Sequence, residues 1–229
     1  MAPTTMIVYH CFIFIWYFFL TYSLFTVNSK ETPVGVFLYG GQWKYLTVLN
    51  VVLQTLFYAV CFVTDLLKPA SGIRLVKFIV SCRDLLFSVL AFPASTFVFL
   101  AFWALYSYDR ELVYPEGLDR IIPVWLNHAM HTAVFPLAVL EIVSSPHHYP
   151  EKKKGLIFLG ICSVSYLSWV IWIYFADGKW VYPFLGLLSP LQFLMFLLGS
   201  QALTAFIYIA GDSLNYLVWG DEDGKKKEN

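Results

Sequence analysis

Six long stretches of this 229-residue sequence contain no Asp, Glu, Lys or Arg, and each is long enough to cross a lipid bilayer. A membrane-spanning helix needs about 20 consecutive, mostly apolar residues. Barrel strands would instead alternate in polarity over roughly ten residues, and no such segments occur. The sequence therefore predicts an all-α, polytopic membrane bundle of about six transmembrane helices, near residues 6–27, 43–65, 84–107, 121–143, 155–176 and 187–210.

The composition agrees with this class and argues against others. Of all residues, 59% are hydrophobic and 13% are charged, whereas soluble domains hold about 25% charged residues. The formal net charge is zero, so no basic excess indicates a nucleic-acid partner. All loops between the predicted helices are short. We therefore expect one transmembrane domain over residues 1–229, which ends in a tail at 211–229.

The distribution of lysine and arginine predicts the orientation. With six spans, both termini share one side of the membrane. That side holds ten basic residues, including Lys152, Lys153 and Lys154, and the other side holds five, which include Arg110 and Arg120. Because loops rich in Lys and Arg stay in the cytosol, we expect both termini to be cytosolic, in the plasma membrane or the endoplasmic reticulum.

The second predicted helix carries a polar stripe on one face. Spacings of three, four and seven residues keep such side chains together on a helix, and the stripe contains Lys44, Thr47, Asn50, Gln54, Tyr58 and Asp65. In hydrocarbon this face must turn toward other helices or a wet cavity. For most of these side chains, hydrogen bonding to a neighbouring helix is a sufficient explanation.

The fourth predicted helix carries two imidazoles, His128 and His131, together with Asn127. Ionisable groups inside a bilayer are costly, so such a pair is a candidate functional site. Zinc sites need three or four ligands, and neither cysteines nor a further histidine lie on this face, so we expect no metal. A histidine that bonds across the bundle remains an equally good explanation for either residue. Pro136 should bend the helix just below the pair.

Helix geometry places Thr47 and His131 at similar depth. The second and fourth helices enter from the same side, near Trp43 and Trp125. At 1.5 Å per residue, Thr47 lies roughly 6 Å and His131 roughly 9 Å below those tryptophans. A hydroxyl beside an imidazole is the minimum for acyl transfer. On spacing alone the pair ranks low, because intramembrane threonines commonly bond their own helix backbone.

Several segments resemble one family, that of the androgen-induced protein and the androgen-dependent TFPI-regulating protein. The similar segments begin at Gly40 and continue to Trp219, and they include Gly40-Gly-Gln-Trp-Lys-Tyr-Leu-Thr47, Arg83-Asp-Leu-Leu-Phe-Ser-Val-Leu-Ala-Phe-Pro93, Tyr108-Asp-Arg-Glu-Leu-Val-Tyr-Pro115, Trp125-Leu-Asn-His-Ala-Met-His-Thr132, His148-Tyr-Pro150 and Trp180-Val-Tyr-Pro183. Members of this family look like multi-pass membrane hydrolases of fatty acid esters of hydroxy fatty acids (FAHFA), which require an intramembrane threonine and histidine.

By motif, the resemblance implies Thr47 as nucleophile and His131 as base. Asn50, Asn127 and His128 are candidates to orient the histidine or stabilise an oxyanion, and Lys44, Arg110 and Arg120 are candidates to bind a substrate carboxylate. The partner would be a lipid substrate drawn from the bilayer, with no cofactor. The alternatives are a non-enzymatic lipid or sterol binder and a transport protein. An apolar fourth helix from Ala133 to Leu140 argues against a conducting pathway.

Overall fold

A computed structural model describes residues 3–27, 39–67 and 72–227. This part of the chain is helical, and no strand occurs in it, so the predicted all-α class is confirmed. Lys30 and Lys68, which entered the charge count, and the last two residues of the predicted tail lie outside the described residues. The helices, in chain order, are α1 (Pro3–Val27), α2 (Leu46–Leu67), α3 (Arg74–Leu86), α4 (Phe92–Tyr108), α5 (Val124–His131), α6 (Val134–Ser144), α7 (Lys152–Asp177) and α8 (Pro190–Lys227).

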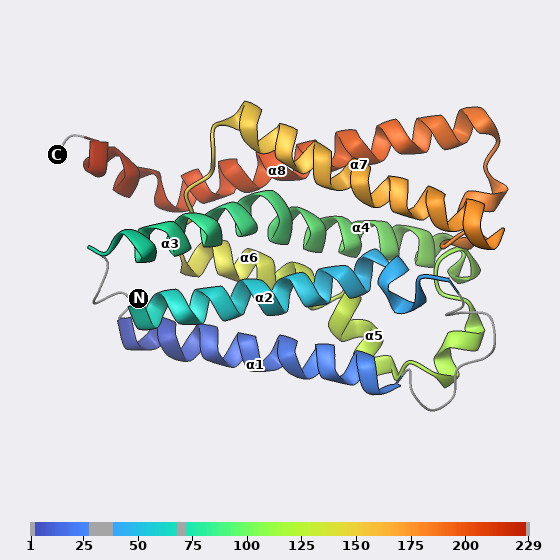
Figure 1. The fold of residues 1–229 in the computed structure, drawn as a ribbon, viewed down its shortest axis with the longest axis horizontal. Helices are drawn as coiled ribbons and strands as arrows, with labels where there is room; N and C mark the ends of the chain where they lie inside the picture. The colour runs from blue at the N-terminus through green and yellow to red at the C-terminus, as the bar shows by residue number, and fades with distance from the viewer. Residues whose placement is uncertain (1–2, 28–38, 68–71, 228–229) are drawn as a thin grey trace.

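These helices supply the crossings of a multi-pass membrane protein. Five of them, counting the run Arg74–Tyr108 as one, are long and apolar enough to span a bilayer, and the bent pair of α5 and α6 makes a sixth. They lie side by side as a bundle (Figure 1), and the start of α1 and the end of α8 reach the same end of it. Short 3-10 turns connect them at Gly41–Lys44 (η1), Arg110–Leu112 (η4), Glu116–Arg120 (η5) and Pro183–Leu187 (η6).

The third crossing is longer than the charge-free stretch that predicted it. Helix α3 begins at Arg74, well before residue 84. It includes Arg83 and Asp84, which pair with each other at 2.6 Å and are both buried, so this crossing carries two charged residues. A π-helical turn (η3, Phe87–Ala91) joins α3 to α4. Pro93 follows that turn, and since proline has no N–H to donate, it suits a local break in the helical hydrogen-bond pattern.

The fourth crossing is bent, as the sequence predicted. Helices α5 and α6 meet at an angle of 42°. Pro136 lacks the N–H that would bond Thr132, four residues earlier, so the helix breaks at Thr132 and Ala133. His131 is the last residue of α5 before the bend, and its side chain is buried.

The last helix extends well beyond the predicted span. Helix α8 continues through the segment that was expected to be a tail and ends at Lys227. No proline follows Pro190 in this segment, so nothing in it forces the helix to stop. Helices α7 and α8 expose large apolar side chains along their outer faces, including Phe175 and Leu198. Such a surface suits contact with lipid.

Candidate active site

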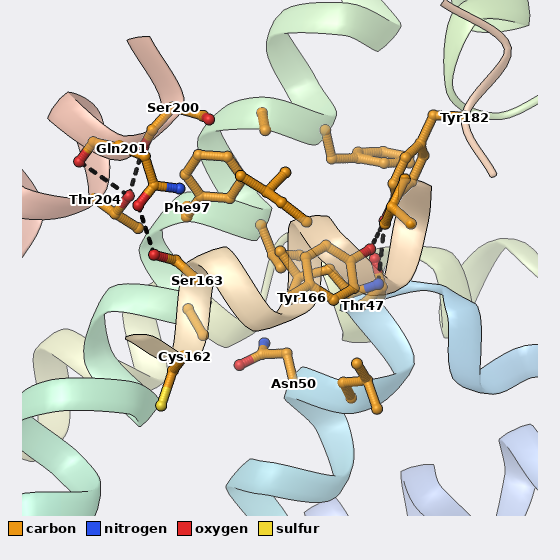
Figure 2. A pocket seen from close by; sticks show the side chains of 18 of the residues that line it. Thr47, Asn50, Phe97, Cys162, Ser163, Tyr166, Tyr182, Ser200, Gln201 and Thr204 are labelled. Carbon is orange, nitrogen blue, oxygen red and sulfur yellow. Dashed lines mark hydrogen bonds between the residues drawn. The ribbon is translucent and has the colours of Figure 1, made fainter. Parts of the chain in front are cut away.

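The N-terminal end of α2 is fixed by its surroundings. Gly40 and Gly41 adopt positive φ angles of 75° and 54°, which glycine tolerates without strain, and the chain then forms η1. Two tyrosines hold the next turn (Figure 2). The backbone N–H of Leu46 donates to the hydroxyl of Tyr182 at 3.1 Å, and Tyr182 contacts the hydroxyl of Tyr166 at 2.8 Å. Thr47 is therefore held at the second residue of a well-anchored helix.

Thr47 and His131 meet across the bundle. The hydroxyl oxygen of Thr47 lies 3.1 Å from Nε2 of His131, although 84 residues separate them in the chain. This is hydrogen-bond distance. The direct contact between α2 and α5 brings together the two residues that the sequence placed at similar depth. Thr47 is half-buried, and His131 is only 5% exposed.

The tautomer of His131 follows from its other nitrogen. Nδ1 lies 2.7 Å from the side-chain oxygen of Asn127 and 3.0 Å from its backbone carbonyl oxygen. Both partners are acceptors, so Nδ1 carries the proton and donates. Nε2 then presents a lone pair, which accepts the O–H of Thr47. The ring of Phe102 stacks on the imidazole, with centroids 3.5 Å apart and planes 9° apart, and this fixes its orientation.

Two cavities meet at Thr47. The larger, of about 250 Å³, lies between α2, α4, α7 and α8, and its lining is mostly apolar, with Leu53, Phe97 and Leu167 among its members. Figure 2 shows it from close by. The smaller has a volume of about 90 Å³, and His131 lines it. Thr47 and Phe102 line both. The hydroxyl of Thr47 thus stands where the two cavities adjoin.

Asn50 lies one turn below Thr47 and lines the larger cavity (Figure 2). Its side-chain oxygen accepts from Gln54 at 3.2 Å and from Ser95 at 3.3 Å. Its side-chain nitrogen, Nδ2, is buried and makes no hydrogen bond within the described part of the chain. Gln54 also donates to the carbonyl oxygen of Ala91, so this part of the polar stripe bonds neighbouring helices, as expected. Asn50 differs because it keeps a free donor at the cavity.

The structure does not bring His128 to the pair. Its side chain is exposed, its Nδ1 lies 3.1 Å from the hydroxyl of Thr132, and its ring stacks on Trp103. Asn127 contacts His131 instead, because side chains four residues apart lie one above the other on a helix. Of the three candidates named for orientation or oxyanion binding, Asn127 contacts the imidazole, Asn50 lines the cavity, and His128 does neither.

The three basic candidates for carboxylate binding lie around the site without lining either cavity. Arg110 pairs with Asp119 at 2.7 Å, and Arg120 is exposed. Lys44 is buried beside the ring of Tyr45. Burial lowers the pKa of the Lys44 ammonium group, which Asp177 partly opposes. Nothing in these contacts aims a positive charge at Thr47.

Sequence reasoning missed Tyr182. This residue was not among the predicted site residues, yet Tyr182 lines both cavities and bonds the N-terminus of α2. Burial raises the pKa of its hydroxyl, so the group stays a hydrogen-bond donor. The only signal in the sequence was that Tyr182 belongs to one of the segments that carry the family resemblance, Trp180-Val-Tyr-Pro183.

Known proteins resemble this chain over almost its whole length. The family described as FAR-17a/AIG1-like protein matches residues 5–216. The chain belongs to this family. The androgen-dependent TFPI-regulating protein of Homo sapiens is 46% identical over 228 residues, which cover 100% of this chain and 99% of that protein.

Two further known proteins align with this chain at lower identity. The androgen-induced gene 1 protein of Homo sapiens is 41% identical over 197 residues, or 83% of each chain. A membrane protein of Schizosaccharomyces pombe is 30% identical over 176 residues, which cover 75% of this chain and 74% of the yeast protein. No solved structure matches this chain.

Proposed function

We propose that this chain is an intramembrane esterase that cleaves fatty acid esters of hydroxy fatty acids, with Thr47 as nucleophile and His131 as general base. The observation that carries the proposal is the 3.1 Å contact between the Thr47 hydroxyl and Nε2 of His131. The orientation of His131 by Asn127 supports it, because a nucleophile needs a base that is itself held in place by a third group.

The reaction would proceed in two halves. As the Thr47 oxygen attacks the ester carbonyl carbon, its proton moves to Nε2 of His131. The tetrahedral intermediate collapses, the ester C–O bond breaks, and His131 returns the proton to the departing hydroxy fatty acid. Water then attacks the acyl group on Thr47, with His131 again as base. The fatty acid leaves, and the threonine hydroxyl is restored.

Two groups are suited to stabilise the negative charge on the carbonyl oxygen. The backbone N–H of Thr47 belongs to the first turn of α2, where N–H groups lack an intrahelical acceptor and the helix dipole favours negative charge. Nδ2 of Asn50, one turn further on, is buried and has no acceptor in the described residues. Donors already aimed at a developing oxyanion are among the largest contributions to catalysis.

The cavities support a branched lipid ester as substrate. An ester of a hydroxy fatty acid carries long apolar chains on both sides of the scissile bond. Thr47 lines two cavities, of about 250 and about 90 Å³, which offer room for these chains. Each CH₂ transferred from water contributes about 0.8 kcal/mol, and chains already dissolved in a bilayer reach such a site without crossing water.

The test is hydrolysis of a branched fatty ester by the purified protein in detergent. Wild-type protein should turn over the ester, and Thr47→Val, which keeps the shape and removes the hydroxyl, should not. Thr47→Ser should retain part of the activity. Thr55→Val is the matched control, since Thr55 lies on the same helix and bonds Thr21 away from the site. If wild-type protein hydrolyses no ester, the chain is a lipid binder instead.

A further inference from the structure

A second cluster of buried polar groups lies at the other end of the bundle, where the start of α1, the end of α2 and the end of α6 come together (Figure 1). We call it the α1–α2–α6 cluster, and its side chains are His10, Cys61, Asp65, Asp84, Glu141 and His147. Its centre is Glu141, which is 0% exposed, and its Oε1 lies 3.3 Å from Nε2 of His10 and 3.1 Å from Nε2 of His147. The proposed esterase chemistry uses none of these groups.

Both histidines of the α1–α2–α6 cluster are oriented by an aspartate. Nδ1 of His10 lies 2.6 Å from Oδ2 of Asp65, and Nδ1 of His147 lies 3.1 Å from Oδ1 of Asp84. Carboxylates accept, so each Nδ1 carries a proton and donates. A carboxylate behind an imidazole, with Nε2 facing inward, is the arrangement that supports metal-bound histidines.

Nε2 of His10 and Oε1 of Glu141 face each other and need a positively charged species between them. With Nδ1 protonated, Nε2 of a neutral His10 presents a lone pair to a carboxylate oxygen of Glu141, and the two repel. A proton on Nε2 or a metal ion relieves the repulsion. The 3.3 Å separation is longer than the roughly 2.7–2.9 Å of a charge-assisted hydrogen bond. The separation does match two ligands of a tetrahedral zinc ion. Two such ligands, each bonded to zinc at about 2.0–2.1 Å, lie roughly 3.3 Å from each other.

Two more atoms point to a ligand at this place. The second oxygen of Glu141, Oε2, is fully buried and makes no hydrogen bond within the described residues. Cys61 is also fully buried, and its sulfur and the ligand atoms of His10 and Glu141 all lie within 4.8 Å of one another. Thiolate, imidazole and carboxylate are all zinc ligands.

We propose that His10, Cys61 and Glu141 bind a zinc ion that joins α1, α2 and α6. Asp65 orients His10, and His147, oriented by Asp84, bonds Glu141 from the other side. Glu141 completes the coordination with its second oxygen. Cys61 binds as a thiolate, so the cluster carries four negative charges with the carboxylates of Asp65, Asp84 and Glu141. One zinc ion and Arg83 supply three positive charges, and His147, which donates from Nδ1 to Asp84 and from Nε2 to Glu141, supplies the fourth.

The role of this zinc ion is structural. Neither of the two cavities at Thr47 is lined by a member of the cluster. Catalytic zinc sites keep one position open for water or substrate, whereas structural sites are closed. The ion would tie the first helix to the bundle through His10, which is 55 residues from Asp65 and 131 residues from Glu141 in the chain.

The first test is the metal content of the full-length protein, purified in detergent without chelators. We expect about one zinc ion per chain, as for a structural site. The ion should be lost in Cys61→Ser and in Glu141→Gln, and retained in Cys11→Ser, which removes a neighbouring thiol on α1. After replacement by cobalt, wild-type protein and Cys11→Ser should show thiolate-to-cobalt charge-transfer absorption, and Cys61→Ser should not.

A second measurement needs no variant, so it holds even where a substitution prevents folding. A zinc chelator should lower the Tm of wild-type protein, and added Zn²⁺ should restore it. Two results would overturn the proposal. The first is a protein that contains far less than one metal ion per chain and whose Tm changes with neither chelator nor Zn²⁺. Protons alone would then hold the cluster together. The other is a full complement of zinc that persists in both Cys61→Ser and Glu141→Gln.

Discussion

The two ends of α2 hold two polar clusters, and only one of them has access to a cavity. Thr47 and Cys61 are fourteen residues apart on α2, which is roughly 21 Å along the helix axis. At the first end Thr47 contacts one neutral histidine and adjoins two cavities. At the second end two histidines surround Glu141, and neither cavity reaches them.

In our proposal, this difference separates the groups that react from the groups that hold the fold together. A reactive pair needs space for a substrate and a base with a free lone pair, and the Thr47–His131 pair has both. The α1–α2–α6 cluster has more titratable groups, yet each faces a protein partner of opposite charge or a shared ligand position. Burial and polarity alone therefore do not identify an active site. The proposed active site differs from the other cluster because Thr47 and His131 line cavities.

We call the end of α2 that carries Thr47 the open end, because Thr47 lines two cavities, and the end that carries Cys61 the closed end. The largest expected effect is at the open end. His131→Ala should lower kcat for a branched ester by about 10³-fold, or about 4 kcal/mol of barrier, because the nucleophile loses its base. Steady-state kinetics of the purified variant measure it, with the Tm as a check on folding. If the variant keeps a near-wild-type kcat, His131 is not the general base, and the two ends of α2 no longer differ in catalytic role.

The next effect belongs to the closed end. Glu141→Gln should lower the free energy of unfolding by about 3 kcal/mol, since removing one partner of a buried charge network leaves the others uncompensated. The kcat of the folded fraction should stay within a few-fold of wild type. Thermal unfolding and ester hydrolysis on the same sample measure both. A loss of kcat with an unchanged Tm would mean that the second cluster takes part in catalysis.

Asn50→Leu sharpens the account of the open end. Losing one oxyanion donor should lower kcat by about 10²-fold with KM almost unchanged. Gln54→Leu is the matched control, because it breaks the same hydrogen-bond network but removes no group from the cavity wall. Equal losses in the two variants would assign Asn50 a packing role only.

The smallest effect tests the larger cavity. Ala94 lines it two turns of α4 away from Phe102. Ala94→Trp should reduce kcat/KM for long-chain esters about tenfold, the equivalent of two excluded CH₂ groups at about 0.8 kcal/mol each. Short-chain esters should be unaffected. Leu100→Trp, on the exposed face of the same helix, is the control. A loss for all chain lengths would mean that the cavity does not hold the acyl chain.

The sequence predicted the open end better than the closed one. Thr47 and His131 belong to stripes whose periodicity shows on a single helix, and the positions of Trp43 and Trp125 give their depth. The family resemblance supplied the roles. His10, by contrast, is a lone imidazole on a mostly apolar helix, and Asp65 was grouped only with the polar stripe of its own helix. Their partners come from elements far apart in the chain, so no local pattern reveals the cluster.

The choice between Asn127 and His128 was also beyond the sequence. Both lie near His131 on the helix face, at spacings of four and three residues. Only the packing of α5 against α4, with Phe102 on one imidazole and Trp103 on the other, directs His131 inward and His128 outward. The extent of α3 was missed for a related reason. The prediction of each span required a stretch without charged residues, whereas Arg83 and Asp84 neutralise each other inside this crossing.

The most direct test of the central claim is peptide mass spectrometry of the protein after reaction with a fluorophosphonate probe. The account predicts that the adduct lies on the hydroxyl of Thr47 in the wild type and in Thr55→Val, and that His131→Ala shows almost none. An adduct on any other side chain, or equal labelling of Thr47 with and without His131, would contradict it.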